Sequence, residues 1–286
     1  MSEALAKHVP PGVSAKLDEH YDASDGDAHL DVFYPTRLDN TTTVLPTIVW
    51  MHGGAWVSGD KGQIANYLRI LAGKGYTVVG VNYSIAPRKT YPAPLRQVNA
   101  ALSYLQANAT RLHVDPSQFF LAGDSAGAQI AAQFANIVSV PSYARMVEIK
   151  PAIQRSQLRG VLLYCGAYDI ERVDFNGASG IFLKTVLWSY AGQKDFATDP
   201  AFATASVLRY VTPAFPPTFI SAGNADPLAP QSDAMAETLV KQKVRVDSLF
   251  FPKDHSPGLA HEYQFDLDNE AGQQALERSV RFLSSR

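Results

Sequence analysis

The stretch Phe119-Phe120-Leu121-Ala122-Gly123-Asp124-Ser125-Ala126-Gly127 joins a short apolar run to an alanine-rich run at residues 128–137. The first run predicts a strand and the second predicts a helix, which places a glycine-flanked serine in the turn between them. Such a tight turn needs small residues, because a Cβ at Gly123 or Gly127 would collide with neighbouring backbone. The turn would lift the Ser125 hydroxyl to a helix N-terminus, where negative charge is favoured. The pattern predicts a nucleophilic serine, and its structural alternative is a helix N-cap.

Outward from this turn, short apolar runs alternate with helical patterns. The runs are nearly continuous in Val, Ile, Leu and Phe, which is typical of strands buried on both faces. The predicted strands are His29–Tyr34, Thr47–Met51, Thr77–Asn82, Phe119–Ala122, Gly160–Tyr164, Thr218–Ser221 and Val246–Phe251. This alternation predicts the α/β class, with a mostly parallel central sheet flanked by helices.

The bulk properties fit one globular domain over residues 1–286, with 46% hydrophobic and 18% charged residues. A net charge of −2 gives no reason to expect nucleic acid or an anionic membrane as a partner. The N-terminus lacks a signal-peptide pattern and no apolar run is long enough to span a bilayer, so we expect a cytoplasmic protein. The lone cysteine, Cys165, excludes an intrachain disulfide and is expected to be a buried hydrophobe. The sequence leaves open whether the chain forms a homodimer.

Two stretches do not fit the alternation of strands and helices. Residues 1–25 precede the first predicted strand, and residues 170–213 separate two strands by more than one crossover helix. Long insertions in compact domains are often lids or binding loops. We therefore expect both stretches to form a small helical cap over the site. The alternative for the insertion is that its apolar residues pack onto the main core.

A second glycine motif, His52-Gly53-Gly54-Ala55-Trp56, follows directly on the predicted strand Thr47–Met51. Acyl transfer passes through an oxyanion that needs hydrogen-bond donors fixed in advance, and residues with small side chains let backbone N–H groups point into a site. Gly54 and Ala55 are the candidate donors, with Gly53 as an alternate and Ala126 after the nucleophile as a third. We expect His52 to orient the loop by hydrogen bonding. The alternative is an ordinary turn after a strand.

Together the two glycine motifs resemble those of the hormone-sensitive-lipase-like carboxylesterases, a family of the α/β-hydrolase superfamily. That family carries H-G-G-G-[FW] upstream of G-D-S-A-G, and here Ala55 replaces the third glycine. Further segments are similar to the family's Y-R-L-A-P, F-P-A-P and D-P-L segments, namely Asn82–Pro87, Tyr91–Pro94 and Ala225–Leu228. The resemblance implies an α/β-hydrolase fold and hydrolysis of short or medium acyl esters, with no metal or organic cofactor.

The order of the catalytic residues in this fold is serine, then acid, then histidine. Asp226 follows the strand Thr218–Ser221 and is the candidate acid, although an Asp-Pro pair is also an ordinary turn signal. The base should follow the last strand, where His255 and His261 both lie. His261 resembles the histidine of the family's H-G-F segment and is the favoured base, with His255 as the alternate.

The sequence therefore predicts a serine carboxylesterase that acts on a small-molecule ester. One alternative is that the same machinery deacetylates sugars or cleaves feruloyl esters. A second alternative is that this chain is a non-catalytic homologue that only binds a small ligand. Four aromatic residues could line the substrate pocket, although packing is the commoner role for such side chains: Trp56, Tyr83, Trp188 and Tyr190. The remaining histidines show no metal-ligand spacing, so no metal site is expected.

Overall fold

The computed structural model describes residues 2–173 and 175–285, and Met1, Asp174 and Arg286 lie outside the described residues. Its centre is an eight-stranded sheet with the strand order β1-β2-β4-β3-β5-β6-β7-β8. The strands are β1 Val13–His20, β2 His29–Pro35, β3 Leu45–Met51, β4 Thr77–Val81, β5 Val114–Asp124, β6 Leu158–Tyr164, β7 Thr218–Ala222 and β8 Val246–Phe250. In this spatial order, every neighbouring pair from β4 through β3 and on to β8 is parallel, which confirms the predicted mostly parallel sheet.

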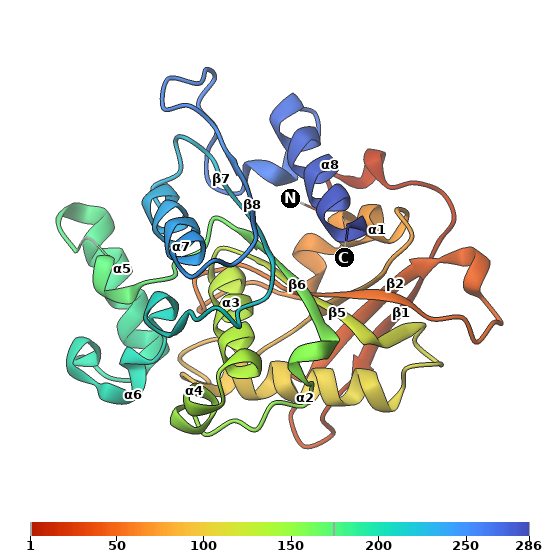
Figure 1. Cartoon of the computed structure of the whole chain (residues 1–286), viewed down its shortest axis with the longest axis horizontal. Helices are drawn as coiled ribbons and strands as arrows, with labels where there is room; N and C mark the ends of the chain where they lie inside the picture. Colours follow the sequence, from red (N-terminus) through yellow and green to blue (C-terminus); the bar gives the residue numbers. More distant parts are fainter. Residues whose placement is uncertain (1, 174, 286) are drawn as a thin grey trace.

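Helices cover both faces of this sheet (Figure 1). They are α1 Ala65–Ala72, α2 Ala93–Ala107, α3 Ala126–Ser139, α4 Pro141–Met146, α5 Gly177–Ala191, α6 Pro200–Ala203, α7 Ala229–Lys241 and α8 Glu270–Ser284. Neighbouring residues of β3 belong to different cores: Val49 packs in the core that contains α2, α3 and α7, and Trp50 packs in the core that contains α1 and α8. The strands β2 to β7 are largely buried on both faces, which explains their continuous apolar sequences.

The N-terminal segment differs from the expectation. Residues 13–20, which we expected within a cap over residues 1–25, form the edge strand β1 and pair antiparallel with β2. Their sequence does carry the signal of a half-exposed strand, because Val13, Ala15 and Leu17 alternate with polar residues. An edge strand has one unpaired side and is open to solvent, and Leu17 remains 54% exposed. This alternating strand lacks the continuous apolar run that marked the others.

The insertion between β6 and β7 is helical and contains α5 and α6. It is tied to the main domain through Tyr190, whose ring stacks on Trp56 with 4.9 Å between ring centroids and whose carbonyl accepts from the amide of Tyr91 at 2.8 Å. In Figure 1 it lies on the side of the molecule away from β1 and β2. A cap role for residues 170–213 stays a prediction. No helix in residues 2–173 and 175–285 is both long and apolar enough to cross a bilayer.

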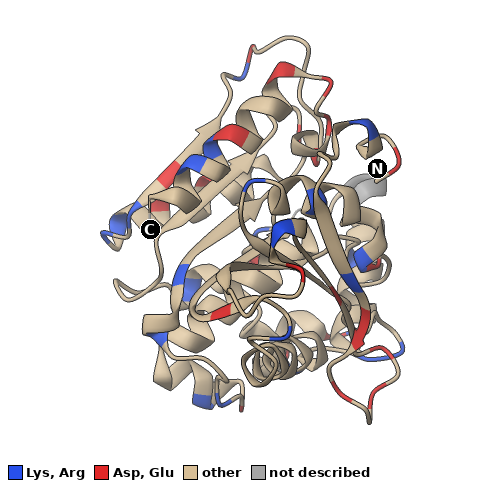
Figure 2. Ribbon diagram, turned by 90° about the vertical axis from the view of Figure 1, so that its right-hand side faces the viewer, with Lys and Arg blue, Asp and Glu red and all other residues tan. Residues whose placement is uncertain are grey.

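Charged residues of both signs are interspersed over the molecule, as the face in Figure 2 shows. The helix that ends at the C-terminus carries Lys or Arg next to Asp or Glu along its length. This mixture agrees with the formal net charge of −2.

Candidate active site

Ser125 occupies a sharp turn between β5 and α3, with φ 52° and ψ −120°. Positive φ is uncommon for a residue with a side chain and is frequent at functional sites, where the surrounding structure maintains the strain. A Cβ on Gly127 would overlap the carbonyl oxygen of Met51, and one on Gly123 would overlap the backbone of Gly127. The glycines are therefore required by the close approach of α3 to the end of β3, as the sequence predicts.

The Ser125 side chain does not cap the helix that follows it. Its backbone amide donates to the carbonyl of Tyr164 at 2.9 Å and contacts the thiol of Cys165. The residue is half-buried, and among the described residues its hydroxyl has no hydrogen-bond partner, His261 included. The hydroxyl is therefore free to meet a substrate, and catalytic hydrogen bonds in ligand-free sites often shorten only on binding.

The carboxylate of Asp226 and the imidazole of His261 form a direct pair. Asp226 follows β7 and His261 follows β8, and neighbouring parallel strands bring the segments after them to the same edge of the sheet. Nδ1 of His261 lies 2.9 Å from Oδ2 of Asp226, whose side chain is fully buried. The other carboxylate oxygen accepts from the amide of Leu228 at 2.7 Å. The acid is thus held in one orientation, while the imidazole remains one third exposed.

The pKa of His261 is raised above its ordinary value of 6.5. Burial by itself lowers the pKa, because it disfavours the charged imidazolium. The hydrogen bond to Asp226 and the negative charges of Asp226 and Glu262 act in the opposite direction and prevail. A histidine with such a pKa can gain or lose a proton within the physiological pH range.

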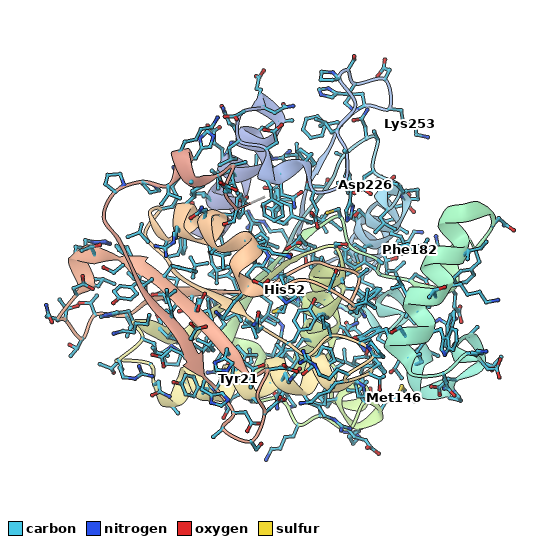
Figure 3. All side chains as sticks on the ribbon, turned by 180° about the vertical axis from the view of Figure 1, so that it is seen from behind. Tyr21, His52, Met146, Phe182, Asp226 and Lys253 are labelled. Carbon is cyan, nitrogen blue, oxygen red and sulfur yellow. The ribbon has the colours of Figure 1, made fainter. Side chains whose placement is uncertain are left out.

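His255 lies elsewhere, on the loop after β8. That loop projects from the body of the molecule, and Figure 3 shows its Lys253 well beyond Asp226. The ring of His255 packs against Phe251 at 5.0 Å between ring centroids, and its carbonyl accepts from the side chain of Asn224 at 3.0 Å. Within the described chain the structure pairs Asp226 with His261 and not with His255.

The loop of residues 52–56 after β3, which we call the glycine loop, presents free backbone N–H groups. Gly54 and Ala55 have φ values of 111° and 53°, so Ala55 adopts a conformation that glycine would adopt with less strain. In the described parts of the chain, the N–H groups of Gly54, Ala55 and Ala126 donate to no acceptor. The N–H of Gly53 instead donates to Oδ2 of Asp124 at 2.8 Å. This corrects the expectation that Gly53 could serve as an alternate oxyanion donor.

His52 and Tyr83 hold this loop in place. Nδ1 of His52 lies 2.7 Å from the carbonyl oxygen of Gly53, and the rings of His52 and Tyr83 stack at 4.3 Å. The Tyr83 hydroxyl donates to the carbonyl of His52 at 2.7 Å. Burial lowers the pKa of His52 to about 4, so its imidazole is neutral and Nδ1 carries the hydrogen that it donates. His52 orients the loop, as expected, and the residue is buried.

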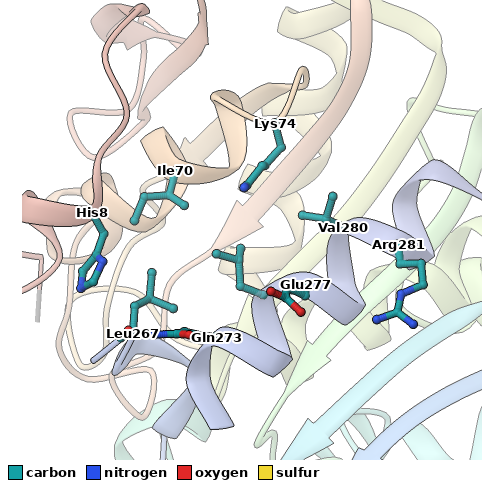
Figure 4. Close-up of a pocket in the computed structure, with 9 residues that line it drawn as sticks. His8, Ile70, Lys74, Leu267, Gln273, Glu277, Val280 and Arg281 are labelled. Atoms are coloured by element: carbon teal, nitrogen blue, oxygen red, sulfur yellow. Dashed lines mark hydrogen bonds between the residues drawn. The ribbon is translucent and has the colours of Figure 1, made fainter. Parts of the chain in front are cut away.

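The four aromatic residues considered for the substrate pocket separate into two groups. Trp56, Tyr83 and Tyr190 are buried and at most 5% exposed, so they pack in the core beside the glycine loop. Trp188 is 42% exposed and lines a surface hollow of about 420 Å³ together with other residues of the insertion and with Pro87 and Thr90 of the main domain. Another hollow, of about 400 Å³, lies between α1 and α8 and contains none of the triad candidates (Figure 4).

Sequence reasoning missed three residues of the site: Asp124, Cys165 and Glu262. Asp124 is the variable residue of G-x-S-x-G, and its carboxylate accepts from Nε1 of Trp50 at 2.7 Å as well as from Gly53. The family motif G-D-S-A-G contains this aspartate, so the signal was present. Cys165 carried no local signal. Glu262 directly follows the favoured base His261, but its contact with Asp124 depends on segments far apart in the chain.

Cys165 is buried, as predicted, but it lies beside the acid and the base. In the described residues, Cys165, Asp226 and His261 form a group whose candidate metal-ligand atoms all lie within 4.8 Å of one another. Metal binding there would require a thiolate and a free Nδ1. Burial, followed by the nearby carboxylates, raises the pKa of the thiol well above its usual range, and Nδ1 already bonds Asp226. The arrangement suits an acid–base pair better than a metal site.

Comparison with known proteins agrees with the fold. A family model described as "alpha/beta hydrolase fold" matches residues 48–262. The chain is 27% identical to "Probable carboxylic ester hydrolase LipM" of Mycobacterium tuberculosis over 72% of this chain and 47% of that protein. It is 24% identical to an "Acetyl esterase" of Salmonella agona over 88% and 78%. The structure of "ESTERASE B from Lactobacillus Rhamnosis" superposes with a TM-score of 0.83 at 23% identity, covering 99% of this chain and 90% of that one. The chain spans about half the length of LipM.

Proposed function

We propose that this chain, which belongs to the α/β-hydrolase-fold family matched over residues 48–262, is a serine carboxylesterase for short- to medium-chain acyl esters. The observation that carries the proposal is the hydrogen-bonded pair of Asp226 and His261. This pair follows the carboxyl ends of parallel strands, as the Ser125 turn does. The three residues occur in the chain order of this fold. The names of the relatives, carboxylic ester hydrolase and acetyl esterase, support the same activity.

In the proposed mechanism the Ser125 hydroxyl attacks the ester carbonyl while Nε2 of His261 takes its proton. Asp226 keeps the proton on Nδ1 and stabilises the imidazolium. The oxyanion would accept from the free N–H groups of Gly54, Ala55 and Ala126, each such donor typically being worth about 3–4 kcal/mol of transition-state stabilisation. The alkoxide leaves with the proton from Nε2, and water then attacks the acyl-enzyme by the reverse sequence.

The raised pKa of His261 determines the acid side of the pH profile. The base must be neutral, so we expect kcat/KM to rise with pH along a single ionisation centred above 6.5. For stability the sign is opposite: the folded state binds this proton more tightly, so the stabilisation is complete below 6.5 and is lost as pH rises through the raised pKa. A kcat/KM profile from pH 5 to 8 checks the prediction, and a midpoint below 6.5 would contradict it.

The acyl preference follows from packing beside the glycine loop. Trp56 and Tyr190 stack face to face and are buried there, and we propose that they limit the room for a long acyl chain. We expect kcat/KM on p-nitrophenyl esters to be highest between acetate and octanoate and to fall at least about tenfold by palmitate, where further methylenes gain no burial. A profile that rises steadily to palmitate would instead indicate a lipase-like acyl site.

Two alternatives remain to be distinguished by substrate. The name of one relative, acetyl esterase, supports acetylated substrates for this chain. A kcat/KM comparison of acetylated xylose, feruloyl and simple acyl esters separates the cases. A non-catalytic ligand-binding relative would not react with a fluorophosphonate probe, whereas the proposed enzyme should be labelled at Ser125. The net charge of −2 supports the expectation that nucleic acid is not a partner. A homodimer and a cytoplasmic location stay predictions.

A further inference from the structure

Two acidic side chains meet beside the glycine loop. Asp124 directly precedes Ser125, and Glu262 directly follows His261. A Cβ on Gly53 would overlap Oδ2 of Asp124 and lie 2.9 Å from Oε1 of Glu262, so both carboxyl groups crowd the space that this glycine leaves open. The two side chains hydrogen-bond to each other. We refer to Asp124 and Glu262 as the carboxyl pair.

The carboxyl pair holds one proton near neutral pH. Two ionised carboxylates have no donor between them, so a hydrogen bond between Asp124 and Glu262 requires a proton on one of them. Burial, followed by the negative charge of Glu262, raises the pKa of Asp124 well above its usual range. The pair therefore carries one negative charge for as long as the two side chains share that proton.

The carboxyl pair connects three segments of the proposed site. Asp124 accepts from Nε1 of Trp50 at 2.7 Å and from the amide of Gly53 at 2.8 Å, which fixes it to the end of β3 and to the glycine loop. Oε1 of Glu262 lies 4.0 Å from Nε2 of His261, the nitrogen that takes the serine proton in the proposed mechanism. The nucleophile turn, the glycine loop and the base segment thus meet at these two carboxyl groups.

We propose that Glu262 is a positioning residue, which through a proton shared with Asp124 keeps His261 aligned with Ser125 and the glycine loop. This inference rests on the proposed function. The Glu262 side chain is 20% exposed, so the pair can exchange its proton with solvent. When that proton leaves at alkaline pH, two adjacent negative charges repel each other, and the exposed partner moves toward water. Its chain neighbour His261 is then displaced from its working position.

The other ionisable groups around the carboxyl pair do not account for an alkaline transition. His261 is already neutral in that range. Burial raises the pKa values of Cys165, Tyr67 and Tyr83, which interact with Asp124, so these groups also remain neutral. Glu262 also lines a hollow of about 280 Å³, whose other ionisable residues besides His261 are His8, Asp266 and Asp268.

The test uses Glu262→Gln, Glu262→Ala and Glu262→Gly, with kcat and KM measured from pH 6 to 10 on a simple ethyl ester by titration of the released acid. Glutamine keeps a neutral donor for Asp124, so we expect kcat of this variant at pH 7.5 to lie within about threefold of wild type. Between pH 7.5 and pH 10 we expect kcat of the wild type to fall at least about tenfold, whereas kcat of the glutamine variant should not fall. Alanine removes the connection, so kcat should fall about tenfold or more with KM nearly unchanged.

The Glu262→Gly variant tests whether a lower kcat reflects loss of the side chain or loss of the fold. Glu262 has φ 62°, a conformation that glycine adopts without strain, so this variant should keep the wild-type Tm and still show the reduced kcat of the alanine variant. Glu237→Gln removes a 71% exposed acid from α7 and should match wild type throughout. Superimposable profiles for wild type and all Glu262 variants, or a glutamine variant as slow as alanine, would overturn the inference. If Ser125→Ala stays active, the proposed function itself fails, and the two failures are thereby distinguished.

Discussion

Ser125→Ala is expected to lower kcat on a short-chain ester by about 10⁴-fold or more and to abolish labelling by a fluorophosphonate probe. No other group can replace the serine oxygen, because the turn presents residue 125 alone between β5 and α3. The fold should tolerate the change, since the side chain makes no capping bond and has no partner within the described residues. Rates on p-nitrophenyl acetate and probe labelling measure the effect.

The matched control for that experiment is Ser284→Ala. Ser284 is exposed at the end of α8 and bonds only the carbonyl of Arg281, so this variant should retain full activity and labelling. An unchanged Tm for Ser125→Ala would show that the loss is chemical and not a loss of folding. A near-normal rate in the folded Ser125→Ala variant would refute the nucleophile and with it the proposed mechanism.

His261→Ala is expected to lower kcat by about 10⁴-fold, while His255→Ala should stay within about threefold of wild type. Of the two histidines, only His261 bonds the buried Asp226 within the described residues, so only its loss removes the proposed proton acceptor. The ring of His255 packs against Phe251 on the projecting loop after β8. Steady-state rates of both variants on the same ester, compared at pH 8, separate the two candidates.

The two histidine variants control for each other, since both truncate an imidazole in the same segment after β8. The KM of His261→Ala should change little, because the base contributes to the proton transfer and not to ground-state binding. A large loss in His255→Ala with near-normal activity in His261→Ala would transfer the role of base to His255 and would require that loop to fold over Ser125.

Much of the candidate site could be predicted because its chemistry is encoded over a few consecutive residues. The glycines around Ser125 are required by backbone contacts that any such turn makes, so G-x-S-x-G between a strand and a helix indicates the structure directly. The glycine loop after β3 was recognisable for the same reason. The availability of its N–H groups was less predictable, because the amide of Gly53 bonds to the carboxylate of Asp124, 71 residues away.

The aromatic residues illustrate the same limit. Trp56 and Tyr190 are far apart in the sequence, and either could have lined a pocket or filled the core. Their face-to-face stacking places both in the core, and only Trp188 keeps an open surface. Sequence composition specifies that an aromatic ring will be buried somewhere, but the partner against which it packs is a property of the folded chain.

By itself, the sequence determined the class of fold, the turn that carries Ser125 and the order of acid and base along the chain, because strand burial, helix periodicity and tight turns are local consequences of residue type. The tertiary structure decided that β1 joins the sheet, that His261 bonds Asp226, and that Glu262 meets Asp124 beside Gly53. Each of these depends on which segments the sheet brings together, and no short stretch of sequence contains that information.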